Sequence, residues 1–200
     1  MTKLFFYVFY LLVLINPISK IFILSVLAKE FRPEEMRLLV RKSSLFAALI
    51  LLALGAGGDF ILTKIFHVQL YSLKTAAGII LFFVGYNALS KGIFFEVDEK
   101  QKMEDISLVP LASPMIAGPA AITAAISMNS ELGLPTASLC IAMAVLVNWL
   151  VMTSYRWVSD WMIKYHLMGA LIRITGLIVA AISVEMVFEG IGEWWRGLSR

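Results

Sequence analysis

The chain has few of the residues on which soluble enzymes depend. Only 16% of its 200 residues are charged, and it contains two histidines and one cysteine. A lone cysteine excludes an internal disulfide and a cysteine-based metal site. The sequence also lacks the His-Glu-x-x-His element of zinc hydrolases. We therefore expect no catalytic residue, no metal site and no cofactor, and predict that the protein is not an enzyme.

Long polar stretches are also scarce, because 60% of the residues are apolar and the mean hydropathy is +0.85. A helix of roughly 20 apolar residues crosses a bilayer core of about 30 Å. Six such runs lie at about residues 4–28, 38–66, 71–92, 107–128, 137–158 and 169–191. They leave no room for a soluble domain, so residues 1–200 are predicted to form one all-α integral membrane domain with six transmembrane segments.

Positive charge is distributed unevenly between the loops. Of the 17 lysines and arginines, eleven lie in the loops after the first, third and fifth segments and five lie on the other side. Because cytoplasmic loops retain positive charge, we expect a multi-pass protein of the cell membrane with both termini outside. The net charge of +3 is spread over short loops, so nucleic acid is not an expected partner and the lipid bilayer is.

Two halves of the sequence echo each other around a polar connector at 94–106. Pro17 matches Pro114, 97 residues later. Gly78 matches Gly176 and Gly92 matches Gly190, each 98 residues later. Each half, about 1–93 and 107–200, holds three segments. Because three is odd, the second half enters the membrane from the opposite face, which predicts the inverted repeat of many secondary transporters.

Both halves carry a helix-breaking sequence in their first segment. The first is Asn16-Pro17, and the second is "PLASPMIAGPAAI" at 110–122. Proline inside a helix costs about 3 kcal/mol, and in lipid an irregular backbone survives only where protein or water covers it. Half-helices meeting at such breaks would offer free N–H groups to a carboxylate and free C=O groups to a cation. The alternative is a pair of simple kinks, but matched breaks in two halves favour a transport site.

Small and polar residues near the breaks are the candidate ligands of a zwitterion. The candidate substrate-binding residues are Asn16, Pro17, Ser19, Ser113, Pro114, Ala117, Gly118, Pro119, Thr123 and Asn148. For Asn148 an inter-helix hydrogen bond is the alternative role. Lys20 is either a snorkelling lysine or a group held against free carbonyl ends.

Intramembrane carboxylates and amides are candidates for coupling to a proton or sodium ion. Glu185 aligns with Asn87 in the repeat, and Asp59 follows two glycines near the end of the second segment. The alternatives are an interfacial position for Glu185 and helix capping for Asp59. The stretch "AGGD" falls one residue short of the Gly-x-Gly-Asp element of membrane aspartyl proteases, and a second deep aspartate is absent.

Three stretches, "INPISKIFILSVL", "LKTAAGIILFFVGYNAL" and "VPLASPMIAGPAAITAAIS", resemble the MarC family of six-span inner-membrane proteins over nearly the whole chain. The family's P-L-A-x-P-x-x-A-G-P motif is present as Pro110, Leu111, Ala112, Pro114, Ala117, Gly118 and Pro119, and its Asn-Pro as Asn16 and Pro17. The resemblance to SnatA-type members implies transport of small neutral amino acids such as glycine and alanine.

The function predicted from these features is ion-coupled secondary transport of a small zwitterionic amino acid by alternating access. An exporter of another small metabolite and a channel remain alternatives, although rings of like charge and a repeated filter loop are missing. The sequence does not indicate the oligomeric state.

Overall fold

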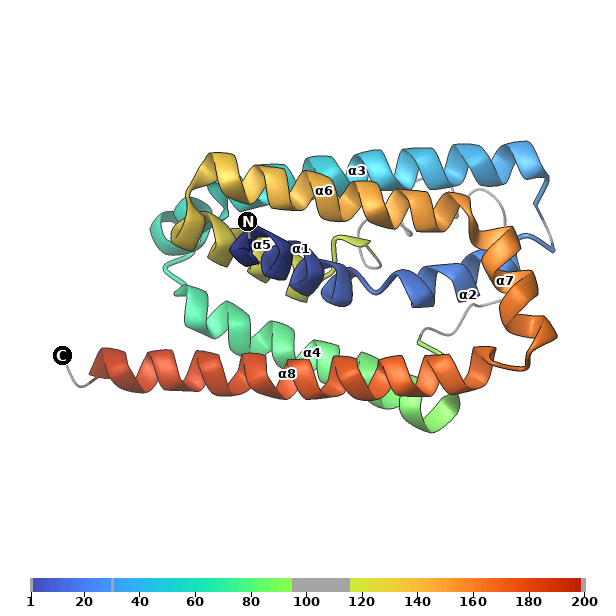
Figure 1. Cartoon of the computed structure of the whole chain (residues 1–200). Helices are drawn as coiled ribbons and strands as arrows, with labels where there is room; N and C mark the ends of the chain where they lie inside the picture. Colours follow the sequence, from blue (N-terminus) through green and yellow to red (C-terminus); the bar gives the residue numbers. More distant parts are fainter. Residues whose placement is uncertain (1, 30, 95–115, 199–200) are drawn as a thin grey trace.

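The computed structural model describes residues 2–29, 31–94 and 116–198, which form a bundle of helices without a β-strand among them (Figure 1). The elements are α1 (Thr2–Ile15), α2 (Pro17–Leu27), α3 (Pro33–Phe60) with a π-helical end η1 (Ile61–Ile65), α4 (Leu70–Lys91), α5 (Pro119–Leu132), α6 (Leu134–Thr153), α7 (Tyr155–Lys164) and α8 (Met168–Leu198). Both chain ends lie at one end of the bundle, here called the terminal end (Figure 1).

Five stretches are long and apolar enough to cross a membrane, namely Lys3–Leu27, Pro33–Ile65, Leu70–Lys91, Leu134–Thr153 and Met168–Leu198. They correspond to the predicted segments one, two, three, five and six. The fourth segment, predicted at 107–128, is described only from Ile116, and α5 has 14 residues, fewer than the roughly 20 that span a bilayer. The chain is thus an all-helical, multi-pass membrane protein with five spans in its described part.

Two predicted boundaries are wrong. The fifth segment does not continue to residue 158, because α6 ends at Thr153 and the chain turns at Ser154 into α7. The hydroxyls of Thr153 and Ser154 donate to carbonyls four residues earlier, at 2.8 and 3.0 Å, a bonding pattern that often bends helices. The sixth segment continues past residue 191, since α8 extends to Leu198.

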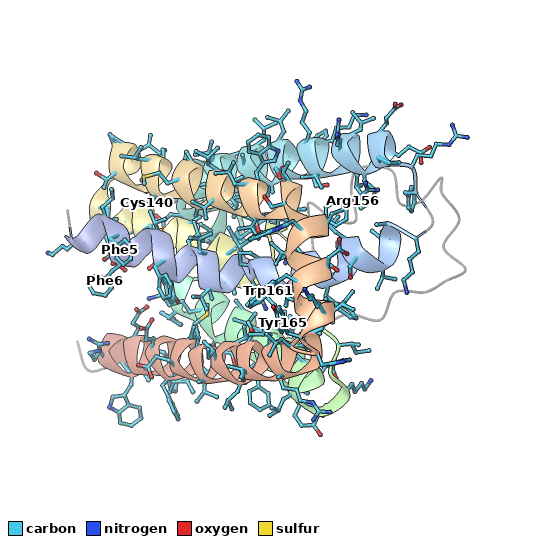
Figure 2. All side chains as sticks on the ribbon, turned by 45° about the vertical axis from the view of Figure 1, so that its right-hand side comes forward. Phe5, Phe6, Cys140, Arg156, Trp161 and Tyr165 are labelled. Atoms are coloured by element: carbon cyan, nitrogen blue, oxygen red, sulfur yellow. The ribbon has the colours of Figure 1, made fainter. Side chains whose placement is uncertain are left out.

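Large apolar side chains cover the outside of the bundle, as expected where lipid replaces water. Phe5, Phe83 and Phe188 are each more than half exposed, and Figure 2 shows Phe5 and Phe6 beside the first turns of α1. The interior contains large apolar residues too, together with many small ones such as the fully buried Ala47 and Ala125. Small residues let helix backbones approach closely, which is how helices associate in lipid.

The closest helix pair consists of α4 and α8, which run antiparallel side by side (Figure 1). A Cβ atom added to Gly85 would lie 2.7 Å from the amide nitrogen of Ala180 and 2.8 Å from the carbonyl oxygen of Gly176. About two turns earlier on α4, a Cβ atom added to Gly78 would lie 2.7 Å from the carbonyl oxygen of Ser183. The two backbones are therefore in direct contact along a glycine seam made by Gly78, Gly85 and Gly176.

The opposite end of the bundle carries the basic residues predicted to be cytoplasmic. Lys29 follows α2, Arg37 and Arg41 lie in the first turns of α3, and Lys164 ends α7. We call it the basic end. All four residues belong to the loops after the first and fifth segments, so the charge asymmetry of the sequence corresponds to a separation in space.

Two glycine-to-alanine substitutions test the close contact of α4 and α8 along the glycine seam. In an open helix position this change adds about 0.5–1 kcal/mol of stability, and Gly169 on α8 has no atom within 4 Å of the added Cβ. At Gly85 the added Cβ meets backbone atoms, so we expect Gly85→Ala to lose about 1–3 kcal/mol. Thermal unfolding in detergent measures both variants, and equal melting temperatures would contradict the close contact.

Candidate functional site

The first spanning stretch is interrupted at Asn16. This residue adopts the left-handed conformation with φ 56° and ψ 76°, and its Oδ1 accepts a hydrogen bond from the Ser19 amide at 3.3 Å. The Ser19 hydroxyl donates back to the Asn16 carbonyl at 2.7 Å. Asparagine is one of the few residues that tolerate this conformation, so the Asn-Pro sequence ends α1 and begins α2 as predicted.

The break leaves α1 with an electronegative end. The Asn16 amide donates to the Leu12 carbonyl at 2.8 Å, but Pro17 has no N–H to donate to the carbonyl of Val13. The last carbonyls of a helix also carry the negative end of its dipole. This end therefore suits an ammonium group or a metal cation.

The start of α5 has the opposite character. Gly118 precedes it in an extended conformation, with φ −68° and ψ 167°, and provides no capping side chain. Pro119 has no N–H, and the first helical bond joins the Ile122 amide to the Gly118 carbonyl at 3.0 Å. The amides of Ala120 and Ala121 are thus the uncapped donors of a positive helix end, which attracts anions.

One cavity of about 190 Å³ joins these two helix ends. Its polar lining consists of Asn16, Ser19 and Lys20, and α5 contributes Gly118, Pro119, Ala120 and Ala121. The remaining wall is apolar and comes from Leu14, Ile15, Ile80, Leu81, Val84, Phe94 and Val179. An apolar pocket with a few convergent polar groups is typical of small-molecule sites. Its volume is below the roughly 300 Å³ at which drug-sized pockets begin, so it suits a ligand of a few heavy atoms.

Lys20 is the buried charge of this cavity. Its side chain is 2% exposed, and its Nζ donates to the Ser19 hydroxyl at 3.1 Å. The described ion pairs do not include Lys20, so none of the described carboxylates neutralises it. A charged side chain at membrane depth is costly and marks function by default. Its ammonium contacts Ser19 at the α1–α2 break and shares the cavity with the positive end of α5. We call the part of the wall made by Lys20 and the start of α5 the anion-binding corner, because both carry charge that attracts an anion.

A second cavity of about 160 Å³ lies on the terminal-end side of the first. Tyr10 lines it one helical turn before Leu14, and Thr123 lines it directly after the α5 residues of the first cavity. Thr123 was a candidate ligand, but it faces this second cavity and donates to the Pro119 carbonyl at 2.8 Å. The two cavities are therefore neighbours, separated by about one helical turn on α1 and by two residues on α5.

Charged side chains close the wall of the second cavity. Lys74 forms ion pairs with Glu193 at 2.6 Å and Glu189 at 3.6 Å. The Tyr7 hydroxyl donates to Glu131 at 2.7 Å. These contacts join α4 to α8 and α1 to the end of α5, so the terminal end of the bundle is tied together by polar side chains.

Asn148 lies outside both cavities. It is fully buried on α6, its Nδ2 lies 3.2 Å from the Met152 sulfur, and its Oδ1 has no partner among the described residues. The described contacts therefore include no inter-helix hydrogen bond of Asn148. Ala117 is buried next to the first cavity without lining it, and Ser113 and Pro114 lie outside the described residues.

The candidate ion-coupling residues are not brought together. Glu185 and Asp59 are exposed on the outside of their helices. Asn87 lines a third cavity of about 570 Å³ near the end of α4. Because Gly85 packs against Gly176, the antiparallel pairing separates Asn87 from Glu185 by more than two helical turns.

Removing the buried charge tests the anion-binding corner without any ligand. Methionine has nearly the length of lysine, so Lys20→Met removes the uncompensated charge with little change in volume. We expect the ligand-free protein to gain about 1–3 kcal/mol of stability. The exposed Lys29 provides the control, since Lys29→Met should change stability by less than about 0.5 kcal/mol. A lower melting temperature for Lys20→Met than for Lys29→Met would show that Lys20 has a counter-charge.

Sequence comparisons agree with this architecture over nearly the whole chain. The family model of MarC integral membrane proteins matches residues 1–195. A UPF0056 membrane protein of Pyrococcus horikoshii is 33% identical over 182 residues, which cover 91% of this chain and 90% of that protein. The UPF0056 membrane protein YvbG of Bacillus subtilis is 29% identical over 187 residues, covering 88% of each chain. None of the solved structures gives a significant match. The family match spans both helix ends of the first cavity, and the chain belongs to the MarC family of integral membrane proteins.

Proposed function

We propose that the protein is a secondary transporter of small neutral amino acids of the glycine and alanine class, working by alternating access. The observation that carries the proposal is the cavity of about 190 Å³ between the end of α1 and the start of α5. It pairs an electronegative helix end with an electropositive one, and a zwitterion has one charged group for each. The resemblance to SnatA-type members of the family supports the same substrate class.

The proposed binding mode assigns one substrate group to each helix end. The carboxylate is held by Lys20 and the amides of Ala120 and Ala121, and the ammonium by the last carbonyls of α1. Asn16 and Ser19 keep the break in shape through their reciprocal hydrogen bonds at 3.3 and 2.7 Å. The apolar walls and the small volume favour side chains no larger than one or two carbons.

An inverted repeat underlies the proposed mechanism, and the seam between α4 and α8 supports it. The repeat alignment adds 98 to each residue number of the first half. It matches Gly78 with Gly176 and Gly85 with Ser183. The contact between Gly78 and Ser183 thereby becomes the contact between Gly176 and Gly85, and both are present. Such an exchange is expected of helices related by a two-fold axis in the membrane plane.

Three neighbouring cavities mark the proposed transport pathway through the protein. The first cavity shares Ile80, Val84 and Phe94 with the third, which opens near the end of α4. About one helical turn of α1 separates it from the second cavity at the terminal end. A site between two thin barriers is what alternating access requires. A proton or sodium ion is the proposed coupling ion, with Asn87 in the third cavity as one candidate contact and Glu185 and Asp59 as the others.

Uptake into proteoliposomes tests the function. We expect saturable, gradient-driven uptake of labelled glycine and alanine, with at least tenfold lower uptake in Asn16→Ala and Gly118→Leu. The matched controls are Asn129→Ala and Gly169→Leu, which alter residues that line neither the first nor the second cavity. Linear, non-saturable flux would indicate a channel. Absence of glycine and alanine binding by folded protein would indicate another substrate.

Ligand analogues test which group of the substrate is recognised by Lys20. Alanine should raise the melting temperature of the wild-type protein, whereas alaninamide, which lacks the carboxylate, should not. Lys20→Met should lose the response to alanine although its own stability rises, and Lys29→Met should keep it. A normal alanine response in Lys20→Met would remove Lys20 from the substrate site while leaving the transport proposal intact.

A further inference from the structure

A groove at the basic end of the bundle has a composition unlike that of the transport cavities. It lies between the start of α3 and the corner where α6 turns into α7, and its volume is about 440 Å³. Three arginines line it, Arg37 and Arg41 from α3 and Arg156 from α7. Met36, Val40 and Trp149 provide apolar walls. The groove therefore combines three positive charges with an apolar floor.

The three guanidinium groups are available to a ligand. Arg37 and Arg41 are four residues apart, so they share one face of α3, and all three arginines are exposed. Arg156 Nε donates to the Tyr155 hydroxyl at 3.1 Å. None of the three is ion-paired within the described residues, where Lys74 makes the described ion pairs. Guanidinium groups suit phosphate because their planar N–H donors match its oxygens in pairs.

The groove opens at the depth of the lipid headgroups. The short helix α7 crosses the basic end of the bundle (Figure 1). Trp157 is 76% exposed and Trp161 is 49% exposed, and the rings of Trp161 and Tyr165 are 5.4 Å apart. Figure 2 shows Arg156, Trp161 and Tyr165 along this corner helix. Tryptophan and tyrosine gather at the membrane–water interface, so they mark that interface beside Arg156.

We propose that this groove binds one anionic phospholipid from the leaflet at the basic end. The headgroup phosphate lies between Arg37, Arg41 and Arg156, and one acyl chain follows Met36, Val40 and Trp149. The three positive charges favour a lipid with net negative charge over a zwitterionic one, and basic pockets between helices at the cytoplasmic side are typical of such sites. A soluble anion would contact the arginines but not the half-buried Trp149 that lines the same groove. The site is separate from the substrate cavity and does not depend on the transport proposal.

Lipid titration of the purified, delipidated full chain in detergent tests the proposal. We expect phosphatidylglycerol to raise the melting temperature and phosphatidylcholine with the same acyl chains to have little effect. The triple variant Arg37→Gln, Arg41→Gln, Arg156→Gln should bind phosphatidylglycerol at least tenfold more weakly. The matched control is Lys29→Gln, Lys42→Gln, Arg173→Gln, which removes the same charge but no residue of the groove.

Three outcomes would overturn the proposal. An equal loss of phosphatidylglycerol binding in both triple variants would show a diffuse charge effect. An equal response of the wild type to both lipids would show that the headgroup charge is not recognised. A response to glycerol 3-phosphate as strong as that to phosphatidylglycerol would assign the groove to soluble phosphate compounds. Wild-type stability of the arginine variant in plain detergent distinguishes lost binding from misfolding.

Discussion

The architecture depends on one constraint of the bilayer, which offers no hydrogen-bond partner to an exposed backbone group. A helix can stop at Asn16 in the middle of an apolar segment only if other parts of the chain cover its open end. α5, α4 and α8 provide that cover, and the space that remains between them is the first cavity. The requirement that stabilises the break thus also creates a polar site in an apolar surrounding.

The helix breaks could be predicted from the sequence because they depend on the backbone properties of neighbouring residues. The Asn16-Pro17 pair and the Gly118-Pro119 pair disfavour a continuous helix, and the structure has a helix boundary at each. The apolar runs and the distribution of basic residues likewise indicated most of the spans. The break between α6 and α7 was missed because the residues at it, Thr153 and Ser154, give no clear break signal: the same hydroxyl-to-carbonyl bond occurs at Thr75 and Thr175 within continuous helices.

The direction of side chains could not be predicted, because it depends on how each helix is rotated against its neighbours. Thr123 lies on the predicted helix and yet lines the neighbouring cavity. The importance of Lys20 became clear for the same reason, since only the structure shows that its side chain is buried in a cavity lined by residues of α4, α5 and α8. Its position one turn after a proline break, within an apolar segment, was the signal available in the sequence.

The glycine seam between α4 and α8 limits how the molecule can deform. Two helices whose backbones touch cannot roll or separate without opening voids along their whole length, so the pair behaves as a rigid beam. The interrupted helices α1, α2 and α5 have no such contact with a single neighbour. The backbone at Asn16 joins two half-helices outside this rigid pair, so a small rotation about a few of its bonds changes the direction of α1 relative to α2.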